Sequence, residues 1–407
     1  MLRLVIVALG FLGGLSAGES LEADLTDFVL PPASYQQTPE TLEQAFPKGS
    51  WSKNPYYEWL DADKTRAIIK RKAFASLSLD LSILDGTVPV DELIIDFQDG
   101  TFLGCTVSLF NRGDSGRLSQ AEFDARTTAV GKQLAEILQA RTKTRTGNVK
   151  KGIMTSGYVW RSKRGIAALE YNPEAPSTIE FVRLKLAHPR AKGIYTAILE
   201  DRSYATVRKS ALSGNLVREG SKHVIENIPM VDQGAKGYCV VASAQRVFEY
   251  YGISCDMHQL AQIAKSDPER GTSSIETNRQ LGAIDYLFKT RYSCLAVGHG
   301  GRLVELEENR YVGKDVPKRK FEKYIENFIN DGIPLLWSLD LGRYQEHPPL
   351  HEQTSGGHMR LIVGYDLNER KLYFSDSWGA GHACKYMDLD DAYRATSGLF
   401  SLVPTQN

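Results

Sequence analysis

Cys239 is the residue whose type and surroundings best suit nucleophilic chemistry. It follows a glycine-punctuated segment, residues 232–238, and begins a run whose apolar residues recur at helical spacing until Gly252. At the start of a helix, unpaired N–H groups and the helix dipole favour an anion, which lowers the pKa of a thiol. Because inert cysteines also occur at buried helix starts, the interpretation of Cys239 as a nucleophile depends on its partners.

Three further residues have the side chains that a thiol nucleophile needs. Gln233 lies six positions before Cys239, and its amide can join the Cys239 backbone N–H in binding an oxyanion. His358 opens an expected strand after two glycines and can serve as the base. Asp376 follows eighteen positions later and can accept the other imidazole proton, with Trp378 covering the pair. Each is an ordinary loop, strand or turn residue when taken alone, so the prediction of acyl transfer depends on the set.

The motifs around these residues resemble those of the papain-like cysteine peptidases, including the C39-like branch that is similar to bacteriocin-leader peptidases. Gln233 and Cys239 stand in the pattern Gln-Gly-x-x-x-x-Cys. His358 is followed at the family spacing by Gly364-Tyr365, and Ser375-Asp-Ser-Trp-Gly379 is similar to the family's Asn-Ser-Trp-Gly. The resemblance covers about residues 228–404, near the size of one domain.

This resemblance implies a fold and a set of roles. The fold is a helical layer that carries the nucleophile, packed against an antiparallel sheet or barrel. Cys239 is implied as nucleophile, His358 as base and acid, and Asp376 as the residue that orients the imidazole. Gln233 is implied as an oxyanion-hole donor. The implied reaction is hydrolysis of peptide bonds in a peptide or protein substrate.

The sequence departs from papain itself at several positions. Ala235 and Lys236 stand where papain has a loop cysteine, and Val240 replaces the tryptophan that follows the nucleophile. Asp376 in place of asparagine is more like the leader-peptidase branch, and it stabilises an imidazolium by charge as well as by hydrogen bonding. Arg360 has no family counterpart, and we interpret it as a surface strand residue, with a place beside the cleft as the alternative.

Periodicity predicts helices first and strands afterwards in this part of the chain. Helices are expected over residues 239–251, 256–264, 277–288 and 318–330. Strands are expected over residues 334–339, 359–365, 372–374 and 399–403. Segregated helices and strands of this kind indicate an α+β fold.

The preceding part of the chain predicts a separate α+β domain of unknown role. A strand is expected over residues 73–84, and Asp99-Gly100 joins two β-rich runs, residues 93–97 and 101–110, as a hairpin. A helix is expected over residues 119–138, with Ser119 as N-cap and Glu122 three positions later. Strands are expected again over residues 157–171 and 179–187. A basic cluster, whose members are Arg141, Lys143, Arg145, Lys150 and Lys151, is interpreted as a solvated loop after that helix.

The N-terminus predicts export. Arg3 precedes a short apolar stretch and the small residues Ser16, Ala17 and Gly18, as in a cleaved signal peptide. No other stretch is long and apolar enough to cross a membrane. Since no Asn-x-Ser/Thr sequon occurs, a bacterial periplasmic or extracellular location is the simplest expectation. The expected organisation is a signal peptide over 1–18, an extended arm over 19–50, the first domain over 51–204, a linker over 205–227 and the peptidase domain over 228–407.

Composition and the remaining residues exclude several other functions. Lysine plus arginine equals aspartate plus glutamate at 49 each, so bulk electrostatics does not favour nucleic-acid binding. His347, His351 and His358 do not predict a metal site, because Pro348 and Pro349 prevent the helix that would align the first pair. No cofactor is expected. With five cysteines in all, at least one stays outside any intramolecular disulfide; Cys255 and Cys294, or either with Cys384, are candidate pairs, and pairing that includes Cys105 stays open.

Three alternatives to a plain peptidase stay open at this level. The same four residues would serve an amidase or acyltransferase that acts on cell-wall peptides. The chain would instead be a binding protein if its N-terminal domain did the work and the hydrolase domain were degenerate. That N-terminal domain could also block the active site as a pro-segment until the connection is cut.

Overall fold

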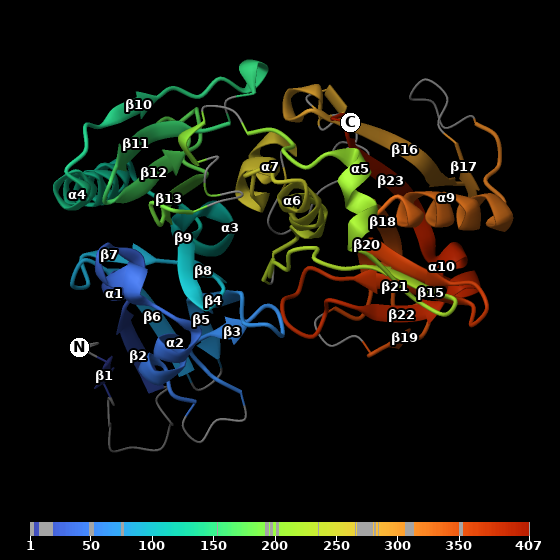
Figure 1. The fold of residues 1–407 in the computed structure, drawn as a ribbon, viewed down its shortest axis with the longest axis horizontal. Coiled ribbons are helices and arrows are strands. Elements are labelled where there is room, and N and C mark those ends of the chain that lie inside the picture. The colour runs from blue at the N-terminus through green and yellow to red at the C-terminus, as the bar shows by residue number, and fades with distance from the viewer. Residues whose placement is uncertain are drawn as a thin grey trace. The chain divides into compact units, whose positions relative to one another are not determined.

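The chain divides into two compact units, Met1–Val149 with Ile153–Arg202 and Lys150–Gly152 with Ser203–Asn407. The computed structural model describes residues 4–7, 19–48, 53–74, 77–152, 154–191, 195, 198–200, 203–234, 236–264, 266, 280, 282–283, 285–305, 313–349 and 353–406. Figure 1 labels the elements of both units in chain order. Among the described helices, none has the length and apolar character needed to cross a membrane.

The first unit contains an eight-stranded antiparallel sheet. Its strands are β3 (Glu58–Trp59), β4 (Arg66–Lys70), β8 (Glu92–Gln98), β9 (Thr101–Asn111), β10 (Lys143–Arg145), β11 (Ser156–Ser162), β12 (Gly165–Tyr171) and β13 (Phe181–Ala187). They lie in the order β10-β11-β12-β13-β9-β8-β4-β3. β8 and β9 form the predicted hairpin, in which Gln98 pairs with Thr101 across Asp99-Gly100. Both turn residues have positive φ, as this tight connection requires.

A second, five-stranded sheet completes the first unit. Its strands are β1 (Leu4–Val7), β2 (Glu19–Asp24), β5 (Lys72–Phe74), β6 (Leu77–Ile83) and β7 (Val88–Val90). The strand predicted over residues 73–84 is therefore two strands. The helical segments are α1 (Thr26–Val29), η1 (Ala33–Gln36), α2 (Pro39–Ala45), α3 (Arg112–Ser115) and α4 (Gln120–Leu138), with η2 (Val149–Lys151) at the unit boundary. Ser119 and Glu122 close a capping box on α4, as predicted.

The predicted arm over residues 19–50 is wrong for its described part. Residues 19–45 form β2, α1, η1 and α2, and the side chains of Phe28, Leu42 and Phe46 are fully buried in the first unit's core. Burial of these apolar side chains therefore offsets the conformational entropy that the segment loses when it is ordered. The segment belongs to the first unit rather than extending from it. The predicted signal sequence lies outside the described residues except for β1.

The second unit is built on a ten-stranded antiparallel sheet. Its strands are β14 (Leu216–Glu219), β15 (Lys222–Ile225), β16 (Thr290–His299), β17 (Arg302–Val304), β18 (Leu335–Leu341), β19 (Glu346–His347), β20 (Gly356–Asp366), β21 (Lys371–Ser375), β22 (Lys385–Asp388) and β23 (Thr396–Pro404). The main order is β17-β16-β23-β18-β20-β21-β22-β19, and β15 also pairs with β20. β20 is thus central, and every strand predicted from sequence in this unit is a member of the sheet.

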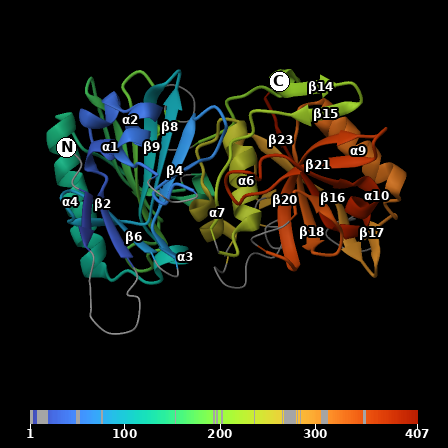
Figure 2. The ribbon, with the colours of Figure 1, turned by 90° about the horizontal axis from the view of Figure 1, so that it is seen from below.

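Helices lie on both faces of that sheet. They are α5 (Lys209–Leu212), η4 (Ser213–Asn215), α6 (Cys239–Tyr250), α7 (Met257–Ala264), η5 (Asp285–Phe288), α9 (Lys318–Asn330) and α10 (Leu389–Ala395). Figures 1 and 2 show α6 on one side of β20 and α9 on the other. α9 matches its predicted range, while most of the helix predicted over residues 277–288 lies outside the described residues. The fold is α+β with large antiparallel sheets, as predicted.

The predicted linker over residues 205–227 is also wrong. β14 and β15 form a hairpin within it, and residues 222–224 of β15 pair with residues 364–366 of β20. The segment is polar and only partly buried because it lies along the surface of the sheet, which is the composition that a linker would also have.

Candidate active site

The start of α6 holds Cys239. Tyr238 precedes it as N-cap without a side-chain hydrogen bond to the helix, so the first N–H groups of α6 are left to face the thiol. All residues of α6 except Cys239 and Glu249 are buried. The Ser243 hydroxyl donates to the Met359 carbonyl of β20 at 3.2 Å. The helix ends as predicted, since Gly252 has a φ of +76° and its N–H bonds back to Glu249. A rigid helix therefore sets Cys239 against the strand that carries His358.

His358 of β20 and Asp376, which directly follows β21, form a buried pair. His358 Nε2 donates to Asp376 Oδ1 at 2.5 Å, and both side chains are almost completely buried. The indole of Trp378 stacks on the imidazole, with ring centroids 4.3 Å apart and planes 15° from parallel. His358 Nδ1 has no nitrogen or oxygen partner within the described part of the chain. The imidazole thus has one nitrogen fixed by a carboxylate and one left for the thiol.

Three pKa shifts couple these groups. Burial alone would lower the pKa of His358, but the Asp376 carboxylate outweighs it and raises that pKa to about 9. Burial would likewise raise the pKa of Asp376, but Arg360 and then His358 lower it to about 2. For Cys239, burial is outweighed by hydrogen bonding and charge from His358 and by the Met359 and Val240 backbone N–H groups, so its pKa is lowered. A thiolate beside an imidazolium is the charge state that these shifts favour near neutral pH.

Gln233 is fixed beside this pair by the loop that follows β21. The Gln233 N–H donates to the Ser377 carbonyl at 2.8 Å, and Asp232 forms a β-bridge with Trp378. Its side chain donates from Nε2 to the Lys236 carbonyl at 3.0 Å and accepts from Ser377 Oγ at 2.6 Å. Because a carbonyl can only accept, the Lys236 contact determines which end of the amide is nitrogen. Ser377, which sequence reasoning did not assign, sits inside the Ser-Asp-Ser-Trp-Gly motif.

Arg360 is not the surface strand residue that the sequence suggested. Its side chain is fully buried, and Nε lies 2.8 Å from Asp376 Oδ2. These two atoms meet without the alignment of a hydrogen bond, so the contact is an ion pair. Arg246 of α6, also missed, donates from Nη1 to the Asp376 backbone carbonyl at 2.8 Å. The sequence gives no indication of a role for Arg246, because it lies about two turns into a helix whose periodicity marks both faces as buried.

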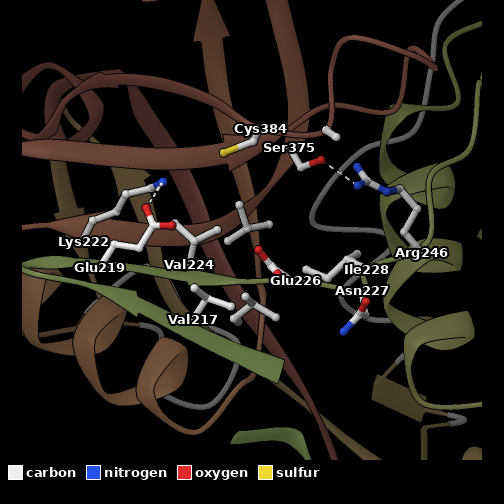
Figure 3. Close-up of a pocket in the computed structure, with 13 residues that line it drawn as sticks. Val217, Glu219, Lys222, Val224, Glu226, Asn227, Ile228, Arg246, Ser375 and Cys384 are labelled. Atoms are coloured by element: carbon white, nitrogen blue, oxygen red, sulfur yellow. Dashed lines mark hydrogen bonds and ion pairs between the residues drawn. The ribbon is translucent and has the colours of Figure 1, made fainter. Parts of the chain in front are cut away.

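A pocket of about 360 Å³ in the second unit is lined mainly by residues 217–228, together with Arg246, Ser375 and Cys384. Figure 3 shows its thirteen lining residues, with the Lys222–Glu219 ion pair towards one end and the Arg246–Ser375 hydrogen bond towards the other. Cys384 and residues of the β14–β15 hairpin lie between them. None of the four predicted site residues lines this pocket, so it is a separate feature of the second unit.

The other cysteines and histidines that the sequence analysis considered do not belong to the candidate site. The structure forms no disulfide among its five cysteines, which all lie in the described residues, so the candidate pairs of Cys255, Cys294 and Cys384 are wrong. His347 lies in β19 and stacks on Tyr386, with ring centroids 5.0 Å apart. His351 lies outside the described residues.

Comparisons with known proteins agree with the predicted resemblance. Residues 225–399 match the model of the Peptidase_C39 like family, which confirms the resemblance to this branch of the papain-like cysteine peptidases. Among solved structures, the chain is similar to xylellain, a cysteine protease from Xylella fastidiosa, with 14% identity over 49% of this chain and 91% of that chain. The TM-score is 0.27, and at that value no geometry is carried over from it. A search of the curated proteins gives no significant match.

Proposed function

We propose that this chain, whose residues 225–399 resemble the Peptidase_C39 like family, is a cysteine peptidase that cleaves peptide bonds through a thioester acyl-enzyme. One observation carries the proposal. A half-buried thiol at the start of α6 is coupled to an imidazole whose far nitrogen is 2.5 Å from a buried carboxylate. This arrangement supports the proposal, because hydrolysis by a thiol requires a nucleophile, a base and a group that orients the base.

Each step of the proposed reaction has a residue to perform it. The Cys239 thiolate attacks the carbonyl carbon of the scissile bond, and the carbonyl electron pair moves onto oxygen. The second N–H of Gln233 Nε2 and the Cys239 backbone N–H bind that oxyanion. As the oxyanion collapses, the C–N bond breaks and the His358 imidazolium gives its proton to the leaving amine. The thioester stays on Cys239.

The second half of the reaction regenerates the thiol. His358, now neutral, takes a proton from a water molecule whose oxygen attacks the thioester carbonyl. The C–S bond breaks, the carboxylic acid leaves, and the thiolate–imidazolium pair is restored. Asp376 keeps the imidazole in the tautomer with the proton on Nε2 throughout, and Trp378 excludes water from the His358–Asp376 hydrogen bond.

Alkylation at limiting iodoacetamide tests the nucleophile. In the wild type, mass spectrometry should find Cys239 modified first at pH 6 to 7, since its pKa is lowered while those of Cys294 and Cys384 are raised by burial. His358→Ala should remove that preference. A Cys384→Ala variant is the control, because it removes a thiol that is not one of the candidate site residues and should leave the Cys239 rate unchanged. Modification of all five cysteines at equal rates in the wild type would contradict the proposal.

Substrate class requires a second measurement. Wild type and Cys239→Ala are incubated with labelled casein and with peptidoglycan fragments, and new N-termini are identified by mass spectrometry. If the wild type cleaves casein and the Cys239→Ala variant does not, the result supports a peptidase. Release from peptidoglycan alone would instead favour the cell-wall amidase that the same residues could form.

We also propose that the protein is exported. The support is the N-terminal sequence, with one early cation, a short apolar stretch and small residues near Gly18. N-terminal sequencing of the protein recovered from a bacterial periplasm should begin near residue 19. Recovery of the intact N-terminus from the cytoplasm would contradict this proposal.

A further inference from the structure

Asp376 is held from both sides by cations, and Arg360 is one of them. One carboxylate oxygen accepts from His358 Nε2 at 2.5 Å, while the other lies 2.8 Å from Arg360 Nε. We propose that Arg360, supported by Glu346 and Lys385, is a positioning residue that fixes Asp376 toward His358 and sets the pH range in which Cys239 reacts. The proposal deepens the proposed function, and it depends on that function only where peptidase activity is the measurement.

Arg360 is itself held in one orientation. Its Nη1 donates to Glu346 Oε2 at 2.6 Å and its Nη2 to Glu346 Oε1 at 3.2 Å, so the carboxylate grips both ends of the guanidinium fork. The guanidinium also lies over the Phe374 ring, 4.4 Å from its centroid. These contacts hold the guanidinium with Nε beside Asp376 Oδ2. Lysine could supply the charge here but not this planar grip.

Lys385 makes this arrangement electrically neutral. Its Nζ forms an ion pair with Glu346 Oε1, and the Lys385, Glu346 and Arg360 side chains are 0%, 5% and 0% exposed. Asp376 and Glu346 carry two negative charges, and Arg360 and Lys385 carry two positive ones. Without Lys385, the negative charge of Glu346 would offset the positive charge of Arg360. The attraction between Arg360 and the Asp376 carboxylate would then be much weaker. The fixed charges of these four side chains therefore sum to zero.

Other charged groups face the same cluster from each packed element. α6 contributes the Cys239 thiol and Arg246, which donates to the Asp376 carbonyl and to Ser375 Oγ. The loop between β21 and β22 contributes His382, whose carbonyl accepts from the Asp376 N–H. Arg246 and His382 thus hold the Asp376 backbone, whereas Arg360 and His358 contact its carboxylate. Arg360 places a permanent positive charge beside one carboxylate oxygen, whereas the charge of His358 at the other oxygen changes with its protonation.

Removal of the Arg360 charge has a definite sign. A nearby positive charge favours the deprotonated form of every titratable group, so its loss raises the pKa of Cys239 and of His358 together. The acid limb of the activity profile reports Cys239 and the alkaline limb reports His358. Both limbs should therefore move to higher pH. A residue that merely filled space would lower activity without moving either limb.

The first test is Arg360→Met. This variant leaves Glu346 paired with Lys385 and Asp376 paired with His358, so no carboxylate loses its last partner. The acid limb of Cys239 alkylation by iodoacetamide should move up by about one pH unit, and both limbs of casein cleavage should follow. Arg360→Lys should leave the limbs in place while kcat falls about tenfold, because charge remains and the fork is lost.

Two further variants check the sign and the specificity. Glu346→Gln removes an anion and keeps Arg360 on Asp376, so both limbs should move to lower pH. Arg183→Met is the matched control in the first unit, since it removes a buried arginine whose Glu170 partner keeps Arg145 and Lys185. It should lower the thermal unfolding midpoint without moving a limb.

The outcomes separate this inference from the proposed function. Limbs that stay in place in both Arg360→Met and Glu346→Gln, with folding intact by circular dichroism, overturn the inference. Should Arg360→Met fail to fold, the Glu346→Gln shift decides alone. If the wild type cleaves no peptide, the acid limb of Cys239 alkylation can still move as described in Arg360→Met and Glu346→Gln. In that case the positioning role stands and the peptidase proposal fails.

Discussion

Each of the two units buries a carboxylate among cationic side chains, and the two clusters differ in whether a histidine is one of the partners. In the first unit, Glu170 of β12 contacts Arg145 at 2.8 Å, Arg183 at 2.7 Å and Lys185 at 3.6 Å. In the second unit, the partners of Asp376 are an arginine and a histidine. Burial opposes ionisation in both, and the cations nonetheless lower the pKa of each carboxylate to about 2.

The comparison teaches that a strongly shifted buried carboxylate does not mark a reaction centre by itself. Among the described residues, the ion-pair partners of Glu170 are two arginines and a lysine, and none of them is an imidazole. Asp376 faces an imidazole whose pKa is raised to about 9 and which is coupled to a thiol. Chemistry requires the titratable partner and the nucleophile, and only the second cluster has them among the described residues.

The largest effect that would sharpen this contrast is expected for His358→Ala. It removes the imidazole that acts as proposed base and acid, so kcat/KM on casein should fall by about 10³- to 10⁴-fold. Asp376 keeps Arg360 as its partner, so the fold should survive. Loss measured alongside an unchanged circular dichroism spectrum supports the assignment. Activity within tenfold of the wild type would show that the two clusters do not differ in function.

Glu170→Gln should give the opposite pattern. The change strips the anion from three buried cations, so the free energy of unfolding of the first unit should fall by about 3–5 kcal/mol. Urea unfolding followed by tryptophan fluorescence and by circular dichroism would measure it. The rate of Cys239 alkylation should stay as in the wild type, provided the second unit is still folded in the assay. A changed alkylation rate under those conditions would mean that the Glu170 cluster serves the site after all.

The contrast also explains how far sequence could go. Gln233, Cys239, His358 and Asp376 could be proposed from sequence because each lies in a local motif whose spacing is fixed by one turn or one strand. Arg360 and Arg145 were both interpreted as solvated, because a cation in a strand or after a helix usually is. Their partners, Glu346 and Glu170, lie 14 and 25 positions away and meet them only across the sheet. No local pattern encodes such a meeting.

Segment boundaries failed for a related reason. Residues 205–227 are polar, and polarity was taken to indicate a linker, yet β15 joins the sheet through backbone bonds to residues 364–366 of β20. Backbone pairing does not depend on side-chain polarity, so an edge hairpin can have the composition of a loop. The hairpin of β8 and β9 was predicted because Asp99-Gly100 is a local turn signal, and α4 because its capping box is local.

Asp376→Asn tests the contrast with the same chemical change as Glu170→Gln. An asparagine can still accept from His358 Nε2, but the anion that raises the pKa of His358 to about 9 is gone. The alkaline limb should therefore move to lower pH, and kcat/KM at pH 8 should fall by about 10²-fold. The profile over pH 5 to 10 measures both. An unmoved alkaline limb would show that the charge of Asp376 does not govern the imidazole.

The smallest expected effect is that of Ser377→Ala, which tests positioning by a neutral group. Ser377 Oγ donates to Gln233 Oε1 at 2.6 Å, so its loss frees the amide to turn while leaving every charge in place. We expect kcat to fall about tenfold, which corresponds to about 1.4 kcal/mol, with both pH limbs unmoved. Ser108→Ala is the control, because Ser108 accepts from Asn111 Nδ2 at 3.2 Å in the first unit. Since removal of a charge near Asp376 should move the limbs and removal of this hydroxyl should not, a shifted limb in Ser377→Ala would break the distinction between the charged and neutral supports of the site.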